Sequence, residues 1–160
     1  MDRLGFEKLH LMAHMSLDFG SINKSFERNQ VIDVMTPAVL LIDDNAIQAA
    51  TRQTILRRAG YFVIAVLNPR RALEQLNNRE FPVEIGLIIT DHIMPEMSGA
   101  AFVRELRLTH TELPVMVISG LEEAEAAYAG LNVLFRLKPV LPDNLLANVH
   151  DLLEPIGPQA

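Results

Sequence analysis

Several short apolar segments of this chain are followed directly by a residue with an acidic, hydroxyl or ammonium side chain. Asp43 and Asp44 follow the apolar run "VLLI", and Asp91 follows "LIIT". Ser119 and Lys138 come directly after two further runs, "VMVI" and "VLFRL". Carboxylate oxygens without histidine or cysteine suit a hard cation such as Mg²⁺, and ammonium and hydroxyl groups both bind phosphoryl oxygens. These residue types together predict phosphoryl transfer, with Asp91 as the nucleophile.

The three carboxylates would repel one another if the fold brought them together. Two like charges 4 Å apart interact by roughly 4 kcal/mol at an effective dielectric near 20. A bound divalent cation and the ammonium group of Lys138 would offset that repulsion, and Ser119 would donate its hydroxyl to a phosphoryl oxygen. Asp91 would then end a buried strand because it is held rigidly beside the metal.

The elements that must position these groups alternate, from Pro37 onward, between β-branched runs and helical patterns. The expected strands are 39–42, 61–66, 84–90, 115–118 and 133–137, and the expected helices are 46–59, 69–77, 98–109, 122–129 and 142–153. Such alternation indicates an α/β fold with a doubly wound, five-stranded parallel sheet. Because residues 85–89 are apolar at odd and even positions alike, helices should cover both faces of the sheet. A flavodoxin-like strand order 2-1-3-4-5 would bring the polar strand ends to one edge.

Length and composition exclude several classes of protein. A chain of 160 residues that is 49% hydrophobic can form one domain with a core, but not two ordinary domains. The formal net charge of −6 disfavours direct binding to nucleic acid. No cysteine is present, which excludes disulfides and fits a cytoplasmic protein. Neither a signal peptide nor a membrane span is recognisable, so we expect a soluble chain without a membrane partner.

We divide the chain into an N-terminal extension at 1–36, a domain at 37–155 and a tail at 156–160. The extension, helical or disordered, could be a docking helix, a dimer-forming element or an arm, so a homodimer is one option. Met35 could instead be the true translation start. His10 and His14 lie one helical turn apart, but no third metal ligand is evident, so ordinary surface histidines are the better interpretation.

Four segments of the chain resemble the receiver domain of two-component response regulators. They are "VLLIDDN", "LIITDHIMPEMSG", "VMVISG" and "FRLKP", and the resemblance runs from about Val39 to Leu153. The second segment is the most specific, because its acid, Met94-Pro95, Met97 and Gly99 all fall where the family has them. The resemblance implies a phosphoprotein of a two-component pathway or phosphorelay.

The resemblance also implies a role for individual residues. It makes Asp91 the phosphoacceptor and part of a Mg²⁺ site to which Asp43, Asp44 and the backbone carbonyl of Ile93 contribute. It makes Ser119 and Lys138 the residues that bind the phosphoryl group. In the family's conformational switch, an aromatic side chain three positions before the lysine turns inward, and Phe135 occupies that place. Phe135 could equally be an ordinary core residue.

Three features depart from the family pattern. The chain between Ser119 and Lys138 is shorter than usual by about one helical turn, so the fourth helix should be truncated or distorted. His92 is less usual beside a phosphoacceptor, and a half-exposed loop residue is the simpler interpretation than a chemical role. Glu96 is similarly interpreted as a surface acid rather than a ligand.

Three functions are compatible with these residues. The first is a switch that accepts a phosphoryl group on Asp91 from a sensor histidine kinase or a histidine phosphotransfer protein, assists its own dephosphorylation, and acts through a downstream protein or as a relay. We expect protein contacts because no output domain follows Leu153. The second is a phosphorylation-independent interaction module of the same shape. The third, a phosphohydrolase, needs an acid two residues after the nucleophile, where Ile93 stands.

Overall fold

The computed structural model describes residues 37–154. The predictions for the extension at 1–36, including those for His10, His14 and Met35, and for the tail at 156–160 lie outside the described residues. Within 37–154 no helix is both long and apolar enough to cross a membrane.

Five parallel strands form one sheet in the order β2-β1-β3-β4-β5, which confirms the predicted topology. The strands are β1 (Ala38–Ile42), β2 (Val63–Val66), β3 (Ile85–Asp91), β4 (Val115–Ser119) and β5 (Leu134–Leu137). The helices are α2 (Ala46–Arg58), α3 (Pro69–Asn77), α4 (Gly99–Arg107) and α5 (Pro142–Leu153), with a 3-10 helix, η1 (Glu122–Tyr128), between β4 and β5.

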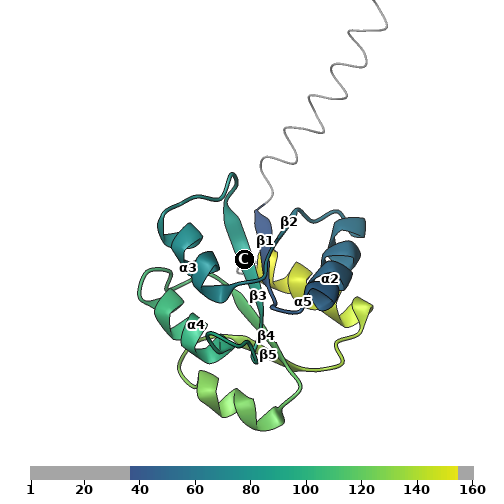
Figure 1. Ribbon diagram of the computed structural model, residues 1–160. Helices are drawn as coiled ribbons and strands as arrows, with labels where there is room; N and C mark the ends of the chain where they lie inside the picture. Colours follow the sequence, from purple (N-terminus) through teal and green to yellow (C-terminus); the bar gives the residue numbers. More distant parts are fainter. Residues whose placement is uncertain (1–36, 155–160) are drawn as a thin grey trace, which may run out of the picture. The chain divides into compact units, whose positions relative to one another are not determined.

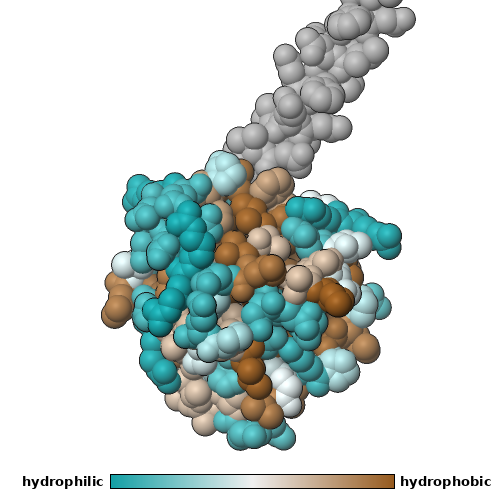
Figure 2. Space-filling model, in the orientation of Figure 1, coloured by the Kyte–Doolittle hydropathy of each residue, from teal (hydrophilic) through white to brown (hydrophobic). Residues whose placement is uncertain are grey.

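Helices cover both faces of the sheet, with α3 and α4 on one side and α2 and α5 on the other (Figure 1). Alternating residues of the central strands supply the two cores, because successive side chains point to opposite faces. Leu40, Ile88 and Val117 belong to the core beneath α3 and α4. Leu41 and Ile89 belong to the core beneath α2 and α5. Figure 2 shows hydrophilic surface over α3 and α2, with apolar residues between them.

Side-chain caps explain where three helices begin. Asn45 accepts hydrogen bonds from the backbone N–H groups of Ile47 and Gln48 at the start of α2. Asn68 caps α3, with Pro69 at its first position, and Ser98 caps α4. The chain then leaves α2 through Gly60, whose φ of 95° lies in the left-handed region that glycine adopts without strain.

The fourth helical segment differs from an ordinary α-helix, in line with the shortened sequence there. Glu122–Tyr128 forms a 3-10 helix, whereas the sequence pattern predicted a helix at 122–129 without its type. A 3-10 helix rises about 2.0 Å per residue against 1.5 Å for an α-helix, so fewer residues span the same distance along the sheet. Two further elements are shorter than predicted by two residues or more: β2 begins at Val63 rather than Tyr61, and α4 is Gly99–Arg107 rather than 98–109.

Candidate functional site

The alternation of side chains along β3 decides which face of the sheet receives Asp91. Leu87 and Ile89 point into the core beneath α2 and α5. Asp91 has the same parity, so its carboxylate also lies on the α2 and α5 face, at the carboxyl end of the central strand. Only 5% of Asp91 is exposed. The strand therefore holds this carboxylate in a fixed, largely dry position.

Both oxygens of Asp91 accept hydrogen bonds. Lys138 Nζ lies 2.7 Å from Oδ2 and forms an ion pair with it, and the backbone N–H of His92 donates to Oδ1 at 2.8 Å. Lys138 follows β5, and its own backbone N–H donates to the carbonyl of Ser119. The structure thus brings together Asp91 and Lys138, which are 47 positions apart in the sequence.

Asp43 lies at the end of β1 and is fully buried. Its Oδ1 accepts a hydrogen bond from the N–H of Asn45 at 2.9 Å, and its Oδ2 forms an ion pair with Arg52 at 2.5 Å. Burial raises the pKa of Asp43, and the Asn45 N–H and the Arg52 guanidinium offset only part of that effect, while the charge of Asp91 adds to it. The charged form of this carboxylate is therefore disfavoured mainly because burial removes its hydration.

A chain of contacts links Asp43 to Asp91. The guanidinium of Arg52 donates to the side-chain oxygen of Gln48 at 3.3 Å, and Lys138 Nζ donates to the same oxygen at 3.1 Å. Gln48 and Arg52 lie one turn apart on α2, so this helix covers the acidic edge. The sequence analysis missed both residues. Their spacing of four was visible in the sequence, but only the packing of α2 shows that they face the acids.

Asp44 and Ile93 are exposed beside the buried pair. Within residues 37–154, no ion pair involves Asp44, and no group of three or more histidine, aspartate and glutamate side chains is arranged to enclose a metal. Mg²⁺ usually binds through one or two carboxylates and several waters, so a complete protein cage is not required. The donor set here, carboxylates and a carbonyl without nitrogen or sulfur, has the chemistry that Mg²⁺ prefers.

Ser119 is the last residue of β4 and follows Ile118, which pairs with Asp91 of β3. The buried hydroxyl accepts a hydrogen bond from the N–H of Leu121 at 3.0 Å and donates to the carbonyl of the same residue at 3.3 Å. In this structure the hydroxyl therefore bonds within its own loop.

Phe135 is half-buried and packs against Tyr128, with the two ring centroids 5.7 Å apart. Tyr128 is 4% exposed, and its hydroxyl lies 2.8 Å from Nδ1 of His92. Burial raises the pKa of Tyr128, so its hydroxyl stays protonated. His92 is half-exposed as predicted, and it also has a specific partner that the sequence did not reveal. Together these rings connect the residue after Asp91 to η1 and β5.

Gly99 makes a close backbone approach behind the phosphoacceptor position. A Cβ atom at this residue would lie 2.5 Å from the carbonyl oxygen of Asp91 and 2.5 Å from the hydroxyl of Tyr128. Real Cβ atoms do not approach other atoms so closely, so the space beneath the Asp91–His92 peptide admits only glycine.

Glu96 accepts a hydrogen bond from the side chain of Asn68 at 2.8 Å, which agrees with a surface role.

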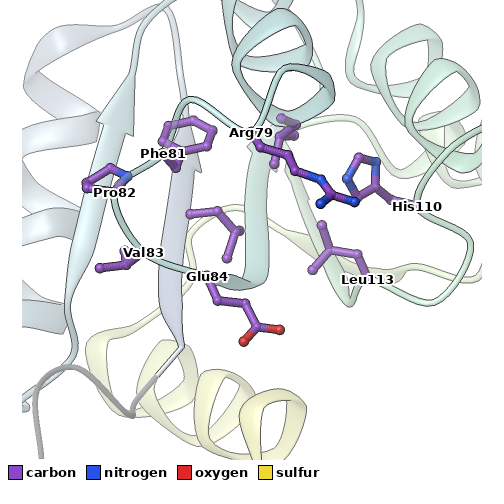
Figure 3. A pocket seen from close by; sticks show the side chains of 9 residues that line it. Arg79, Phe81, Pro82, Val83, Glu84, His110 and Leu113 are labelled. Carbon is purple, nitrogen blue, oxygen red and sulfur yellow. The ribbon is translucent and has the colours of Figure 1, made fainter.

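A separate cavity of about 640 Å³ lies at the other edge of the sheet (Figure 3). It is lined by Leu76, Arg79, Phe81, Pro82, Val83, Glu84, Ile85, His110 and Leu113. Figure 3 shows the side chain of Arg79 extending toward His110. Ile85 is the first residue of β3 and Asp91 the last, about 20 Å apart at 3.3 Å per residue, so the cavity takes no part in the acidic site.

Comparison with known proteins gives a single consistent family. Residues 39–150 match the family described as "Response regulator receiver domain". Transcriptional regulatory protein ZraR of Escherichia coli (strain K12) is 30% identical over 118 residues, which cover 72% of this chain and 26% of ZraR. Two-component response regulator ORR5 of Oryza sativa subsp. japonica is 32% identical over 118 residues, which cover 68% of this chain and 83% of ORR5.

Solved structures show the same fold. The receiver domain of a signal transduction histidine kinase from Syntrophus aciditrophicus superposes with a TM-score of 0.67 at 27% identity, covering 78% of this chain and 95% of that one. The chain spans only 26% of the length of ZraR. Because ZraR is named as a transcriptional regulatory protein, the expectation that this chain has no nucleic-acid partner is not supported.

Proposed function

This chain belongs to the response regulator receiver family of two-component signalling, and on that premise we propose that Asp91 accepts a phosphoryl group from a phosphohistidine donor. The single observation that carries the proposal is the ion pair between Lys138 Nζ and Asp91 Oδ2 at the carboxyl end of the central strand. The distance of 2.7 Å between these two atoms supports the proposal that Asp91 is the nucleophile and Lys138 the group that binds the phosphoryl oxygens.

In the proposed step, an oxygen of Asp91 forms a bond to phosphorus while the bond between phosphorus and the histidine nitrogen of the donor breaks. The leaving imidazole keeps the electron pair and takes up a proton. Asp91 is held in position by β3 and by the N–H of His92, so little reorganisation precedes attack. After transfer, the ammonium group of Lys138 pairs with the phosphoryl oxygens instead of with the free carboxylate of Asp91. Hydrolysis of the acyl phosphate resets the site, so the chain assists its own chemistry without being a conventional enzyme.

We propose that Asp43, Asp44, Asp91 and the backbone carbonyl of Ile93 hold Mg²⁺ beside the phosphoacceptor. When bound, the ion neutralises charge on the transferring phosphoryl group. The burial of Asp43 at the end of β1 supports this assignment, because a cation beside a desolvated carboxylate stabilises its charged form. The oxygen-only chemistry of the set supports it as well.

The proposed output is a change in the loops after β4 and β5. A phosphorylated Asp91 has additional acceptor oxygens, and the hydroxyl of Ser119 can gain one of them only by leaving its bonds to Leu121. Phe135 would move with that loop, since β4 and β5 are paired. Going from mostly inactive to mostly active requires about 5.5 kcal/mol of preferential binding, which several charge-assisted hydrogen bonds can supply.

Exposed apolar side chains surround the carboxyl edge and support docking of a donor protein there. Of the eight large hydrophobic residues exposed within 37–154, six lie in or beside the loops that follow the strands: Ile47, Leu67, Ile93, Leu121, Leu137 and Leu141. Ile47 is 80% exposed. Apolar surface around a polar centre is typical of a protein-binding site. A sensor kinase or a histidine phosphotransfer protein is a donor that could dock on this surface. A cytoplasmic location and the downstream partner stay predictions.

Phosphorylation with a small donor tests the proposal directly. The full chain incubated with acetyl phosphate and Mg²⁺ should gain one acid-stable, base-labile phosphoryl group, measured by mass spectrometry of the intact protein. Asp91→Asn should gain none. Asp151→Asn is the matched control, because this side chain is 81% exposed and lies far along α5. Equal labelling of the wild type and Asp91→Asn would disprove the assignment, and absence of labelling in the wild type would favour a phosphorylation-independent interaction module.

The metal assignment has its own test. Asp44→Ala should weaken Mg²⁺ binding, because water would replace a carboxylate oxygen near the ion. Titration calorimetry measures the affinity, and Asp151→Ala controls for the loss of one negative charge. Identical affinities of the Asp44→Ala and Asp151→Ala proteins would remove Asp44 from the ligand set.

A further inference from the structure

Arg52 reaches from α2 into the acidic site although it takes no part in the proposed chemistry. Its side chain is 14% exposed, and NH1 lies 2.5 Å from Oδ2 of Asp43, whose side chain is fully buried. The other guanidinium nitrogen, NH2, donates to Gln48 at 3.3 Å. Arginine is always charged and pairs well with a carboxylate in a partly dry site. Asp43 therefore has a permanent positive partner supplied by the chain itself.

The remaining charges of the site leave Arg52 as the main counter-ion of Asp43. Lys138 forms its ion pair with Asp91 and donates its other hydrogen bond to the neutral oxygen of Gln48. The oxygens of Asp43 accept from Arg52 and from the N–H of Asn45. Each of the two buried carboxylates is thus paired with one cation of the chain, Asp43 with Arg52 and Asp91 with Lys138.

We propose that Arg52 is a built-in counter-ion that competes with Mg²⁺ at Asp43 and lowers the affinity of the site for divalent cations. The inference rests on the proposed metal site and adds a residue that sets its affinity. Arg52 contacts Asp43 but not Asp91, so it is a positioning residue rather than a catalytic one. A cation that binds to Oδ2 of Asp43 has to share or displace the guanidinium, and a cation beside Asp43 is repelled by it.

A second consequence concerns the metal-free protein. A buried carboxylate without a counter-ion is costly, and removing one partner of a buried pair destabilises a protein. Arg52 holds Asp43 in place when no cation is present, and without Arg52 that task falls to Mg²⁺. The stability of the chain should therefore depend more strongly on Mg²⁺ once Arg52 is neutral.

Arg52→Gln, compared with Arg58→Gln in the full chain, tests the proposal. Both variants lose one positive charge from α2, but Arg58 is exposed and makes no ion pair within residues 37–154. In titration calorimetry with MgCl₂ at constant pH and ionic strength, Arg52→Gln should bind Mg²⁺ about tenfold more tightly than the wild type. Arg58→Gln should match the wild type. Arg52→Lys, which keeps a charge, should lie between the wild type and Arg52→Gln.

Thermal unfolding gives a second measurement of the same effect. Saturating Mg²⁺ should raise the unfolding midpoint of Arg52→Gln by more than it raises that of the wild type or Arg58→Gln. Arg52→Met keeps the apolar stem and replaces Arg52→Gln in both measurements where the glutamine variant does not fold. Equal Mg²⁺ affinity in the Arg52 and Arg58 variants, or weaker binding by Arg52→Gln, would overturn the counter-ion role and leave the metal site standing. Failure of every protein to bind Mg²⁺ would overturn both.

Discussion

Gly99→Ala adds one methyl group directly behind the phosphoacceptor. The new Cβ atom would lie 2.5 Å from the Asp91 carbonyl oxygen, 2.5 Å from the Tyr128 hydroxyl and 3.0 Å from the Cα atom of His92. Favourable contacts between carbon atoms lie at about 3.5–4.0 Å, so the overlap is about 1 Å. Two of the three neighbours are backbone atoms and cannot rotate away. The backbone of α4 or the Asp91–His92 peptide has to move.

The cost follows from two opposing effects. Inserting a methyl group into a filled interior typically costs about 1–3 kcal/mol. Replacing glycine by alanine in a helix favours folding by up to about 1 kcal/mol, and Gly99 has no left-handed φ that would cancel this gain. We therefore expect a net loss of about 1–2 kcal/mol in the free energy of unfolding. For a domain of this size that corresponds to an unfolding midpoint lower by roughly 3–8 °C.

Urea unfolding followed by circular dichroism measures the change, and acetyl phosphate labelling measures its effect on the site. A shifted Asp91–His92 peptide should slow labelling by about tenfold, because in-line attack depends on position. Gly120→Ala is the control: nothing lies within 4 Å of its added Cβ atom, so its stability should stay within about 0.5 kcal/mol of the wild type.

A double variant identifies the contact responsible. Tyr128→Phe removes one of the two atoms closest to the new Cβ. The loss of unfolding free energy in the double variant Gly99→Ala/Tyr128→Phe should therefore be about 0.5–1 kcal/mol smaller than the sum of the losses in the two single variants. Stabilisation by Gly99→Ala, or equal effects of Gly99→Ala and Gly120→Ala, would refute the steric explanation.

Three further predictions concern other parts of the structure. Tyr128→Phe should lower stability by about 1–2 kcal/mol, because the half-buried Nδ1 of His92 loses its partner; an unchanged urea midpoint would contradict this. Arg107→Met should lower the free energy of unfolding by about 2–4 kcal/mol, because Arg107 donates hydrogen bonds to four backbone carbonyls. Arg104→Met loses one such bond and should lower it by less than about 1 kcal/mol. Neither change should slow labelling of the phosphoacceptor. Asp43→Asn should gain stability relative to the wild type as pH rises, when measured without Mg²⁺. The folded pKa of Asp43 lies above its unfolded value of 3.8, so the penalty for ionising it is absent below pH 3.8 and complete above the folded pKa. A difference in urea midpoint that is constant between pH 4 and pH 7 would disprove that sign.

The local pattern of the sequence predicted most of the secondary structure. Alternating β-branched and helical segments, the Asn68-Pro69 start of α3 and the stop at Gly60 are short-range signals, and they act through neighbours in the chain. The shortening between Ser119 and Lys138 predicted a distorted fourth helix, but not that η1 would be a 3-10 helix. Helix ends shifted by one or two residues because capping bonds, rather than apolar periodicity, decide where a helix stops.

For the candidate site, the sequence by itself determined which groups end the strands: carboxylates at Asp43 and Asp91 and an ammonium group at Lys138. The sequence also predicted Ser119 at the end of a strand, but only the structure shows that its hydroxyl forms hydrogen bonds with Leu121. Only the tertiary structure decided that Arg52 forms an ion pair with Asp43, that Gln48 accepts hydrogen bonds from both Arg52 and Lys138, and that Tyr128 forms a hydrogen bond with His92. The physical reason is that these contacts depend on how α2 and η1 pack on the sheet, and packing is set by the summed shape of many side chains far apart in the chain.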